Sequence, residues 1–318
     1  MKKKNTIVLD IGARYGVHPT WKKIENNKSF KYYLFEPDKK EAERLKKKYK
    51  KKKNFKIITS AIGDKNEKSK LFITKHKALS SIYKRKKNNP LLKKNNTDKV
   101  VKSVNINVQT LDNFCNNNNI KPHFLKMDIE GYEFKALKGA SNILHNLLGV
   151  RSEVSFEKIF DTTKEGDFTD LHNLLIQNGF ILLNLDYNGQ GFHYNKFVSQ
   201  RQRYGILQTT DAVWIKNPKE NKFYKSEEDL LRIAVFLFLN NAPDLAIYFL
   251  LKRSKIKFKE ISKSELYKTA LNLAVQHLQS LKFSPGIEQG DINKVFRKIF
   301  NIDYPENEKF NESLLYNP

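Results

Sequence analysis

Short apolar runs alternate with helical patterns over the first two-thirds of the chain. In the segment 38–53, Ala42, Leu45 and Tyr49 recur at the spacing that puts them on one face of a helix. Short apolar runs that are separated by helices are typical of parallel strands that helices cover on both faces. We therefore predict an α/β fold with core strands at residues 6–10, 31–36, 55–61, 124–129 and 150–156.

The stretches between and after these runs depart from that alternation. Residues 75–99 are basic and asparagine-rich and include Pro90, which predicts a long mobile loop. Residues 100–108 alternate polar and apolar positions, as an exposed or edge strand does. Residues 180–185 and 210–215 form two strand patterns joined by a polar link without a helix, so we predict an antiparallel pair.

Beyond residue 217 only helical patterns remain. Ser226-Glu-Glu-Asp229 resembles a capping box, and apolar residues follow it at helical spacing. Three more helices are expected at residues 246–252, 264–281 and 291–300. We predict two domains: residues 1–216 carry the sheet, and residues 217–318 form a helical extension whose apolar faces need a cover.

The composition adds a strong positive charge. Lysine and arginine number 59 against 34 aspartates and glutamates, which gives a formal net charge of +25. Such a charge can attract nucleic acid, anionic lipid or an anionic glycan. The lysines are densest at residues 46–53 but are otherwise scattered among asparagines, and no nucleic-acid motif is visible. A solvated surface is the simpler interpretation, and a surface for an anionic partner is the alternative.

Three features of the sequence narrow the class of protein. The single cysteine, Cys115, excludes a disulfide framework and a multi-cysteine zinc site. Asp10 interrupts the first apolar run too early for a secretory signal. No apolar stretch reaches the roughly 18 residues that a membrane span needs. We expect a cytoplasmic protein; peripheral contact with a membrane and a homo-oligomer stay open.

The first candidate site is the glycine turn after the first strand. Asp10-Ile-Gly12-Ala-Arg-Tyr-Gly16 follows that strand, and Glu36 ends the second strand 20 residues after Gly16. Glycines allow a tight turn and close approach of a ligand to the backbone. Nucleoside-binding sheets place a carboxylate at the end of the second strand to bind the ribose hydroxyls. The turn lacks a Lys-Thr or Lys-Ser ending, which disfavours an ATP-binding P-loop.

The second candidate site is an acidic cluster after the strand at 124–129. On a strand, Lys126, Asp128 and Glu130 point to one side. Charges on a central parallel strand are costly unless they are paired or bind something. Glu153 is another charge in an apolar strand. Asp128, Glu130 and Glu153 are candidates for an oxygen-rich cation site, or equally for a hydrogen-bond network that steers a hydroxyl substrate.

Five motifs follow one another in the first half of the chain. They are Asp10-Ile-Gly12-Ala-x-x-Gly16, Phe35-Glu36-Pro37-Asp38, Ser60-Ala61-Ile62-Gly63-Asp64, Thr110-Leu111-Asp112, and Lys126-x-Asp128-x-Glu130-Gly131-x-Glu133 with Leu137-Lys138-Gly139-Ala140. In this order they resemble the FkbM-type methyltransferases, over about residues 6–216. The resemblance implies a Rossmann-like, seven-stranded, mostly parallel sheet with one antiparallel strand. It also implies S-adenosyl-L-methionine as the methyl donor and leaves dependence on a divalent metal open.

The same resemblance assigns roles in the glycine turn. Gly12, Ala13 and Gly16 would wrap the methionine part of the donor, and Asp10 would anchor that loop or the donor's amino group. Arg14 stands where the wider class often has a middle glycine. Backbone contacts to the donor are therefore expected to differ at this position.

Other matching residues would contact the nucleoside and the methyl group. Glu36 would accept hydrogen bonds from the ribose hydroxyls, and Ala61 and Ile62 would flank the adenine. Asp128 would lie beside the methyl group that is transferred. The resemblance thus implies a donor site along the carboxyl edge of the sheet.

A hydroxyl acceptor must also lose its proton or have its oxygen polarised. Asp128 is the first candidate for the base or the orienting carboxylate, with Glu130 and Glu153 in support. A lone histidine is more often structural or solvated than catalytic. The histidines near the expected site are His18, His76 and His193, of which His76, beside the predicted loop, is the strongest catalytic candidate.

The expected function is O-methylation of a sugar hydroxyl in a surface glycan or glycan precursor. One alternative is a nucleic-acid methyltransferase that the basic surface draws to its substrate, although no Asn-Pro-Pro-Tyr-like motif follows the strand at 124–129. Another is a non-catalytic binding or scaffold protein that acts through its C-terminal helices. Binding of the methyl donor and truncation near Asn217 distinguish these functions.

Overall fold

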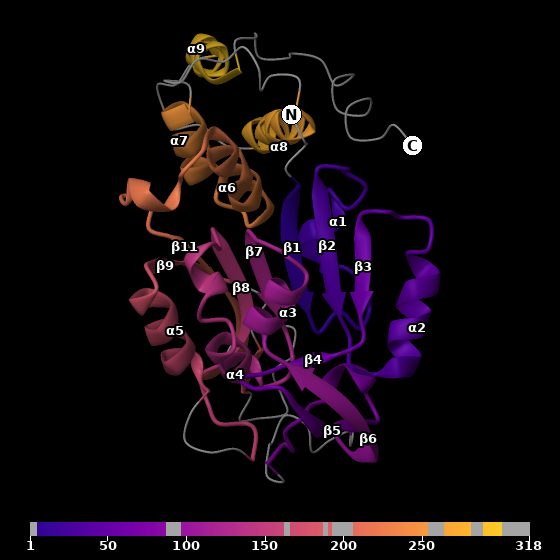
Figure 1. Cartoon of the computed structure of the whole chain (residues 1–318). Helices are drawn as coiled ribbons and strands as arrows, with labels where there is room; N and C mark the ends of the chain where they lie inside the picture. Colours follow the sequence, from indigo (N-terminus) through magenta and orange to yellow (C-terminus); the bar gives the residue numbers. More distant parts are fainter. Residues whose placement is uncertain are drawn as a thin grey trace. The chain divides into compact units, whose positions relative to one another are not determined.

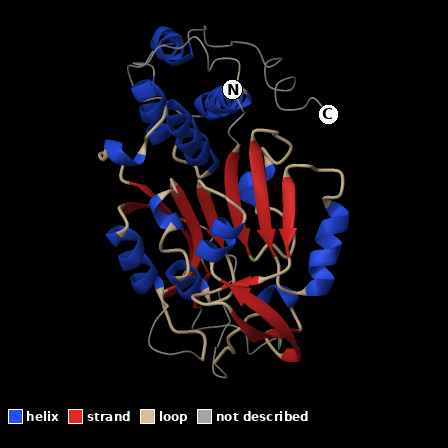
Figure 2. Cartoon of the chain, in the orientation of Figure 1, coloured by secondary structure: helices blue, strands red, loops and turns tan. Residues whose placement is uncertain are grey.

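The fold is organised by an eight-stranded sheet (Figures 1 and 2). The computed structural model describes residues 5–86, 97–161, 166–186, 190–192, 206–253, 264–280 and 289–300. The strand order is β10–β11–β8–β7–β1–β2–β3, with β9 also paired to β11. These strands are β1 (Thr6–Ile11), β2 (Phe30–Phe35), β3 (Phe55–Ile58), β7 (Phe124–Met127), β8 (Gly149–Ser155), β9 (Phe180–Leu185), β10 (Gln190–Phe192) and β11 (Ile206–Lys216).

Strand directions confirm the predicted sheet class. The β1–β7, β7–β8 and β2–β3 pairs are parallel, whereas β11 runs antiparallel to β8. Along β11, residues 206–209 pair with β10 and residues 212–216 pair with β9. Because β9 and β10 share one edge of β11, the eight strands occupy seven positions. The predicted antiparallel pair of 180–185 with 210–215 is also confirmed.

Helix α2 (Lys39–Lys48) shows how local chemistry sets an element's bounds. Asp38 caps its start by accepting a hydrogen bond from the backbone N–H of Lys40. The predicted helix ran to residue 53, but the chain turns at Tyr49. The Tyr49 ring stacks on Phe55 with centroids 4.2 Å apart, and its hydroxyl accepts from the Val17 N–H at 3.1 Å. These contacts tie the end of α2 to the glycine turn.

The described part of the sheet unit has three further α-helices, and polar residues cap two of them. Thr110 caps α3 through the Asn113 N–H, and Asp167 caps α5 through Thr169 and Asp170. The three α-helices are α3 (Leu111–Asn117), α4 (Glu133–Lys138) and α5 (Phe168–Gln177).

A second, three-stranded sheet lies across the carboxyl ends of the parallel strands of the first sheet (Figure 1). It consists of β4 (Ala61–Ile62), β6 (Val100–Gln109) and β5 (Glu67–Thr74), in that order. The predicted strand at 55–61 is thereby divided between two sheets, and β5 was missed. The helix η1 (Lys77–Leu79) begins the predicted loop, whose residues 87–96 lie outside the described residues.

The chain forms two compact units. The sheet unit comprises Ile7–His18 and Lys31–Lys219, and the helical unit comprises Met1–Thr6, Pro19–Phe30 and Glu220–Pro318. No helix in the described part of the chain is both long enough and apolar enough to pass through a lipid bilayer. The helices of the second unit are α1 (Pro19–Lys22), η3 (Asn221–Phe223), α6 (Glu227–Leu239), α7 (Pro243–Arg253), α8 (Glu265–Ser280) and α9 (Gln289–Phe300).

The helical unit brings together distant segments of the chain. Its helix α6 begins at the predicted capping box, where the Ser226 hydroxyl accepts from the Asp229 N–H at 3.1 Å. The buried Trp21 ring lies 5.8 Å from the ring of Phe236. Arg232 donates to the Thr6 hydroxyl at 3.3 Å. The N-terminal segment around α1 is therefore part of the helical core.

Truncation after residue 216 tests the predicted domain division. We expect the shortened chain to aggregate or to lose cooperative unfolding, because Trp21 loses its cover and burial of such a side chain is worth about 3–5 kcal/mol. Size-exclusion chromatography and circular dichroism would measure this. Truncation after residue 300, which keeps α6 to α9, is the control. A monomeric, cooperatively unfolding 1–216 chain would contradict the expectation.

Candidate functional site

A cleft open to solvent, of about 550 Å³, lies in the sheet unit where β1, β2 and β7 end. The second sheet and η1 supply the opposite wall. Apolar lining residues include Ile11, Phe35, Ile62, Leu71 and Ile82, and polar ones include Arg14, Glu36, Ser60, Ser80 and Asp128. The cleft can hold a mixed apolar and polar ligand.

The glycine turn and the acidic cluster meet through the backbone. Gly12 has φ 85°, and a Cβ at this position would lie 1.9 Å from the Asp128 carbonyl oxygen. The N–H groups of Gly12 and Ala13 both donate to the Phe35 carbonyl, at 3.1 and 3.0 Å. The Asp128 N–H donates to the Ile11 carbonyl at 3.1 Å. The turn is thus tied to both β2 and β7, and only glycine fits there.

Asp10, at the start of the same turn, is hydrogen-bonded to His18 just after its end. Its carboxylate is fully buried and accepts from the His18 N–H at 2.8 Å. Oδ1 of Asp10 has no hydrogen-bond partner among the described residues and lies 3.7 Å from the Lys126 ammonium. Burial raises the pKa of Asp10, and Lys126 and the His18 amide oppose that rise. Asp10 therefore anchors the loop rather than lining the cleft.

Gly16 and Ala13 also shape the turn without lining the cleft. Gly16 has φ 108°, and a Cβ there would lie 2.4 Å from the Tyr49 hydroxyl. Its N–H donates to the Ala13 carbonyl at 2.9 Å. Of the eight residues predicted to bind the donor, the cleft is lined by Gly12, Glu36, Ala61, Ile62 and Asp128.

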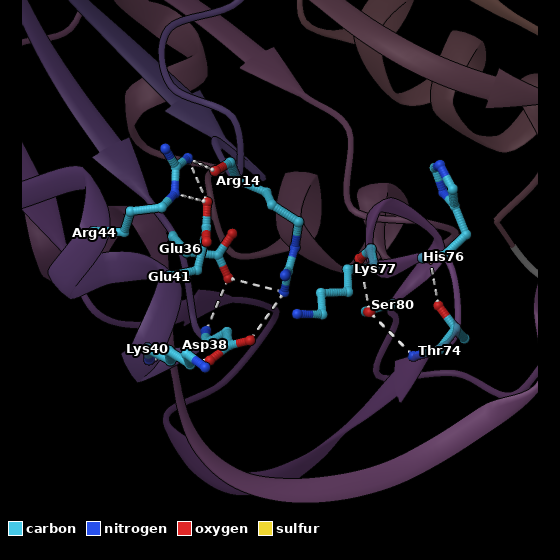
Figure 3. A network of polar contacts seen from close by, with 10 residues as sticks. All are labelled: Arg14, Glu36, Asp38, Lys40, Glu41, Arg44, Thr74, His76, Lys77 and Ser80. Carbon is cyan, nitrogen blue, oxygen red and sulfur yellow. Dashed lines mark hydrogen bonds and ion pairs between the residues drawn. The ribbon is translucent and has the colours of Figure 1, made fainter. Parts of the chain in front are cut away.

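Glu36 lies in the cleft within a network of charged groups (Figure 3). Its Oε1 accepts from the Asp38 N–H at 2.8 Å and lies 3.6 Å from the Arg14 guanidinium. Burial raises the pKa of Glu36 to about 7, and Arg14 and the Asp38 amide oppose the rise. The carboxylate therefore changes its charge near neutral pH.

The predicted acidic cluster is assembled by the fold. Carboxylate oxygens of Asp128, Glu130 and Glu153 all lie within 4.8 Å of one another. Glu130 has φ 57°, an uncommon conformation for a residue other than glycine. It is held by an ion pair with Arg85 and by the Ser81 hydroxyl, which donates to its carbonyl at 2.6 Å.

Three carboxyl groups lie close together in this cluster. Burial raises the pKa of Glu130 to about 8, and Arg85 opposes it. Burial also raises the pKa of Glu153, and the neighbouring Glu130 and Asp128 raise it further. A divalent cation prefers such oxygen ligands, and a hydroxyl could donate to the same oxygens. The residues fit either use.

Lys126 connects the two candidate sites, a role that the sequence did not indicate. Its ammonium lies 3.7 Å from Asp10 Oδ1 and 3.4 Å from Asp128 Oδ2, and the residue is 4% exposed. Burial lowers the pKa of Lys126, but Asp128, Asp10 and Asp211 together raise it above its usual value. The lysine therefore keeps its charge. The sequence feature that could have indicated this role is the position of Lys126 on the same side of the strand as Asp128.

The three histidines differ in their surroundings. His76 is exposed at the start of η1, outside the cleft lining, and its N–H donates to the Thr97 carbonyl at 2.8 Å. Burial lowers the pKa of His18 to about 3, with Lys126 and Arg151 acting in the same direction, so its imidazole is neutral. His193 lies outside the described residues.

Arg85 and Ser81 are site residues that sequence reasoning missed. The Arg85 guanidinium carbon lies 4.8 Å from the centre of the Phe160 ring, and the next residue, Lys86, donates its N–H to the Ile159 carbonyl. These contacts hold the segment around Arg85 beside Glu130. Arg85 belongs to a basic, asparagine-rich stretch that otherwise looks like a solvated loop, so its composition gave no signal.

Comparison with known proteins identifies one match. A family model described as the methyltransferase FkbM domain matches residues 10–182, more than half of the 318-residue chain. The matched span includes the glycine turn, Glu36, the second sheet and the acidic cluster. No curated protein and no solved structure matches the chain.

Proposed function

Because the chain belongs to the FkbM methyltransferase family, we propose that it transfers a methyl group from S-adenosyl-L-methionine to a hydroxyl oxygen. The proposed acceptor is a sugar of a surface glycan or glycan precursor. The observation that carries the proposal is the cleft between Gly12 and Glu36, which faces apolar Ala61 and Ile62. Such a site suits a nucleoside with a polar tail.

The cleft residues fit the donor in chemical type. Gly12 lets the turn pack directly against the Asp128 carbonyl, where any side chain would clash. Oε2 of Glu36 has no hydrogen-bond partner among the described residues, and we assign it to the ribose hydroxyls. Ala61 and Ile62 offer an apolar surface for the adenine. Ala13 and Gly16 support the donor through the shape of the turn.

The methyl transfer itself needs little covalent chemistry from the protein. The donor supplies a methyl group that its sulfonium already activates. Asp128, whose side chain is 43% exposed, orients the acceptor hydroxyl and takes up its proton. Glu130 and Glu153 complete the acceptor side. A divalent cation bound by these three carboxylates would polarise the acceptor oxygen.

Donor binding is the first test of the proposal. The purified protein should bind S-adenosylhomocysteine in calorimetry, and Glu36→Gln should weaken binding about ten- to a hundred-fold, because charge-assisted hydrogen bonds to the ribose are lost. Glu43→Gln, an exposed change on the same α2 segment, is the control. Absence of binding by the unaltered chain would contradict the proposed function. Unchanged binding by Glu36→Gln would contradict the ribose assignment.

The acceptor requires a separate experiment. Mass spectrometry of surface polysaccharide from cells with and without the gene should show loss of one CH₂ increment per acceptor sugar when the gene is absent. Identical spectra would contradict a glycan acceptor and leave the donor assignment unaffected.

A further inference from the structure

Arg14 is placed where its charge acts directly on Glu36. It belongs to the glycine turn, lines the cleft and is 8% exposed. Its guanidinium lies 3.6 Å from Glu36 Oε1 and 3.3 Å from Asp38 Oδ2 (Figure 3).

The surroundings hold Arg14 in place. The Arg44 guanidinium donates to the Arg14 carbonyl at 3.0 Å and is itself paired with Glu41. Asp38, the second carboxylate that Arg14 contacts, is fixed as the cap of α2 through its other oxygen. Arg44 and Asp38 therefore both anchor Arg14 to helix α2, and the Arg14 guanidinium is oriented before any ligand enters.

Glu36 is oriented by the same contacts. Its Oε1 receives both the Asp38 N–H and the Arg14 guanidinium, whereas Oε2 has no partner among the described residues. We propose that Arg14 is a positioning residue for the methyl donor. The Arg14 guanidinium keeps the Glu36 carboxylate ionised and directs the second oxygen of that carboxylate, Oε2, to the ribose. The inference rests on the proposed function of the cleft.

The charges around Glu36 are finely balanced. Burial is the largest influence and disfavours the ionised form; the carboxylates of Asp38 and Glu41 act in the same direction. Arg14 is the nearest opposing charge, Arg44 adds a weaker one, and the Lys77 ammonium points toward Arg14 from η1 (Figure 3). The resulting pKa of about 7 makes the charge of Glu36 sensitive to the loss of one cation.

Calorimetric binding of S-adenosylhomocysteine, measured from about pH 5.5 to 9, tests the inference. Since Glu36 is ionised above its pKa of about 7, affinity should be highest there and fall several-fold as the pH drops through 7. In the Arg14→Met variant, the midpoint of this fall in affinity should move up by about one pH unit. Arg14→Lys should restore most of the original profile. Lys40→Met, an exposed charge on α2, should leave it unchanged.

The outcomes are separable. A uniform loss of affinity at every pH in Arg14→Met, or an unmoved midpoint, would overturn the inference. If Arg14→Met does not fold, Arg14→Gln removes the same charge with a planar polar side chain. The midpoint of the pH dependence of binding in Arg14→Gln then tests the inference in the same way. Glu36→Gln should lose the pH dependence. Absence of binding by the unaltered chain at any pH would overturn the proposed function itself, and this inference with it.

Discussion

Replacing Gly12 by alanine is expected to lower the free energy of unfolding by about 3 kcal/mol or more and to abolish donor binding. The new Cβ would lie 1.9 Å from the Asp128 carbonyl oxygen, in a backbone conformation of φ 85° that alanine disfavours. The backbone fixes the position of the new Cβ, and the oxygen that it meets is itself a backbone atom, so relief requires the ends of β1 and β7 to move apart. Chemical denaturation and calorimetry with S-adenosylhomocysteine would measure the two effects.

Gly166→Ala is the matched control for this prediction. Gly166 has φ 111°, but the nearest atom to its Cβ would be Phe134 Cβ at 3.7 Å. It therefore carries the conformational cost, about 1 kcal/mol, without the steric clash. If Gly12→Ala costs no more than Gly166→Ala and still binds the donor, the close contact between the two strand ends is not what the site depends on.

Replacing Lys126 by methionine is expected to cost about 3–5 kcal/mol of stability at neutral pH. The change removes the buried ammonium that neutralises Asp10 and Asp128 while keeping a similar volume. Asp10 is fully buried, and burial already raises its pKa. The loss should shrink as the pH falls and Asp10 takes up a proton, because the neutral acid no longer needs a counter-ion.

Two comparisons isolate the charge effect. Lys135→Met removes one partner of the more exposed Lys135–Asp64 pair and should cost less than about 1 kcal/mol. The double variant Asp10→Asn/Lys126→Met should recover part of the loss, because the buried carboxylate is removed with its partner. Equal costs for Lys126→Met and Lys135→Met would mean that Lys126 is not an essential counter-ion.

The parts of the site that sequence could predict are those set by local pattern. The apolar runs of β1, β2 and β7 end in Gly12, Glu36 and Asp128, and parallel strands bring their ends to one edge. The position of each residue therefore followed from where its strand stopped.

The parts that could not be predicted depend on contacts between distant segments. Arg85 pairs with Glu130 across 45 residues, and its own neighbours are ordinary surface lysines. Strand β5 begins with Glu67 to Lys70, whose polar character hides the buried Leu71 that follows. Family resemblance placed Ala13 and Gly16 in the donor site, but only the fold shows that they act on the shape of the turn.

The joining of α1 with the C-terminal helices also affects when the protein can finish folding. Trp21 leaves the ribosome more than 200 residues before Phe236, the ring beside it in the finished core. At roughly 5–20 residues per second, about 10–40 s of synthesis separate the two. Throughout that time Trp21 lacks the Phe236 ring as a packing partner on the nascent chain, so the core of the helical unit cannot be completed before α6 has been synthesised.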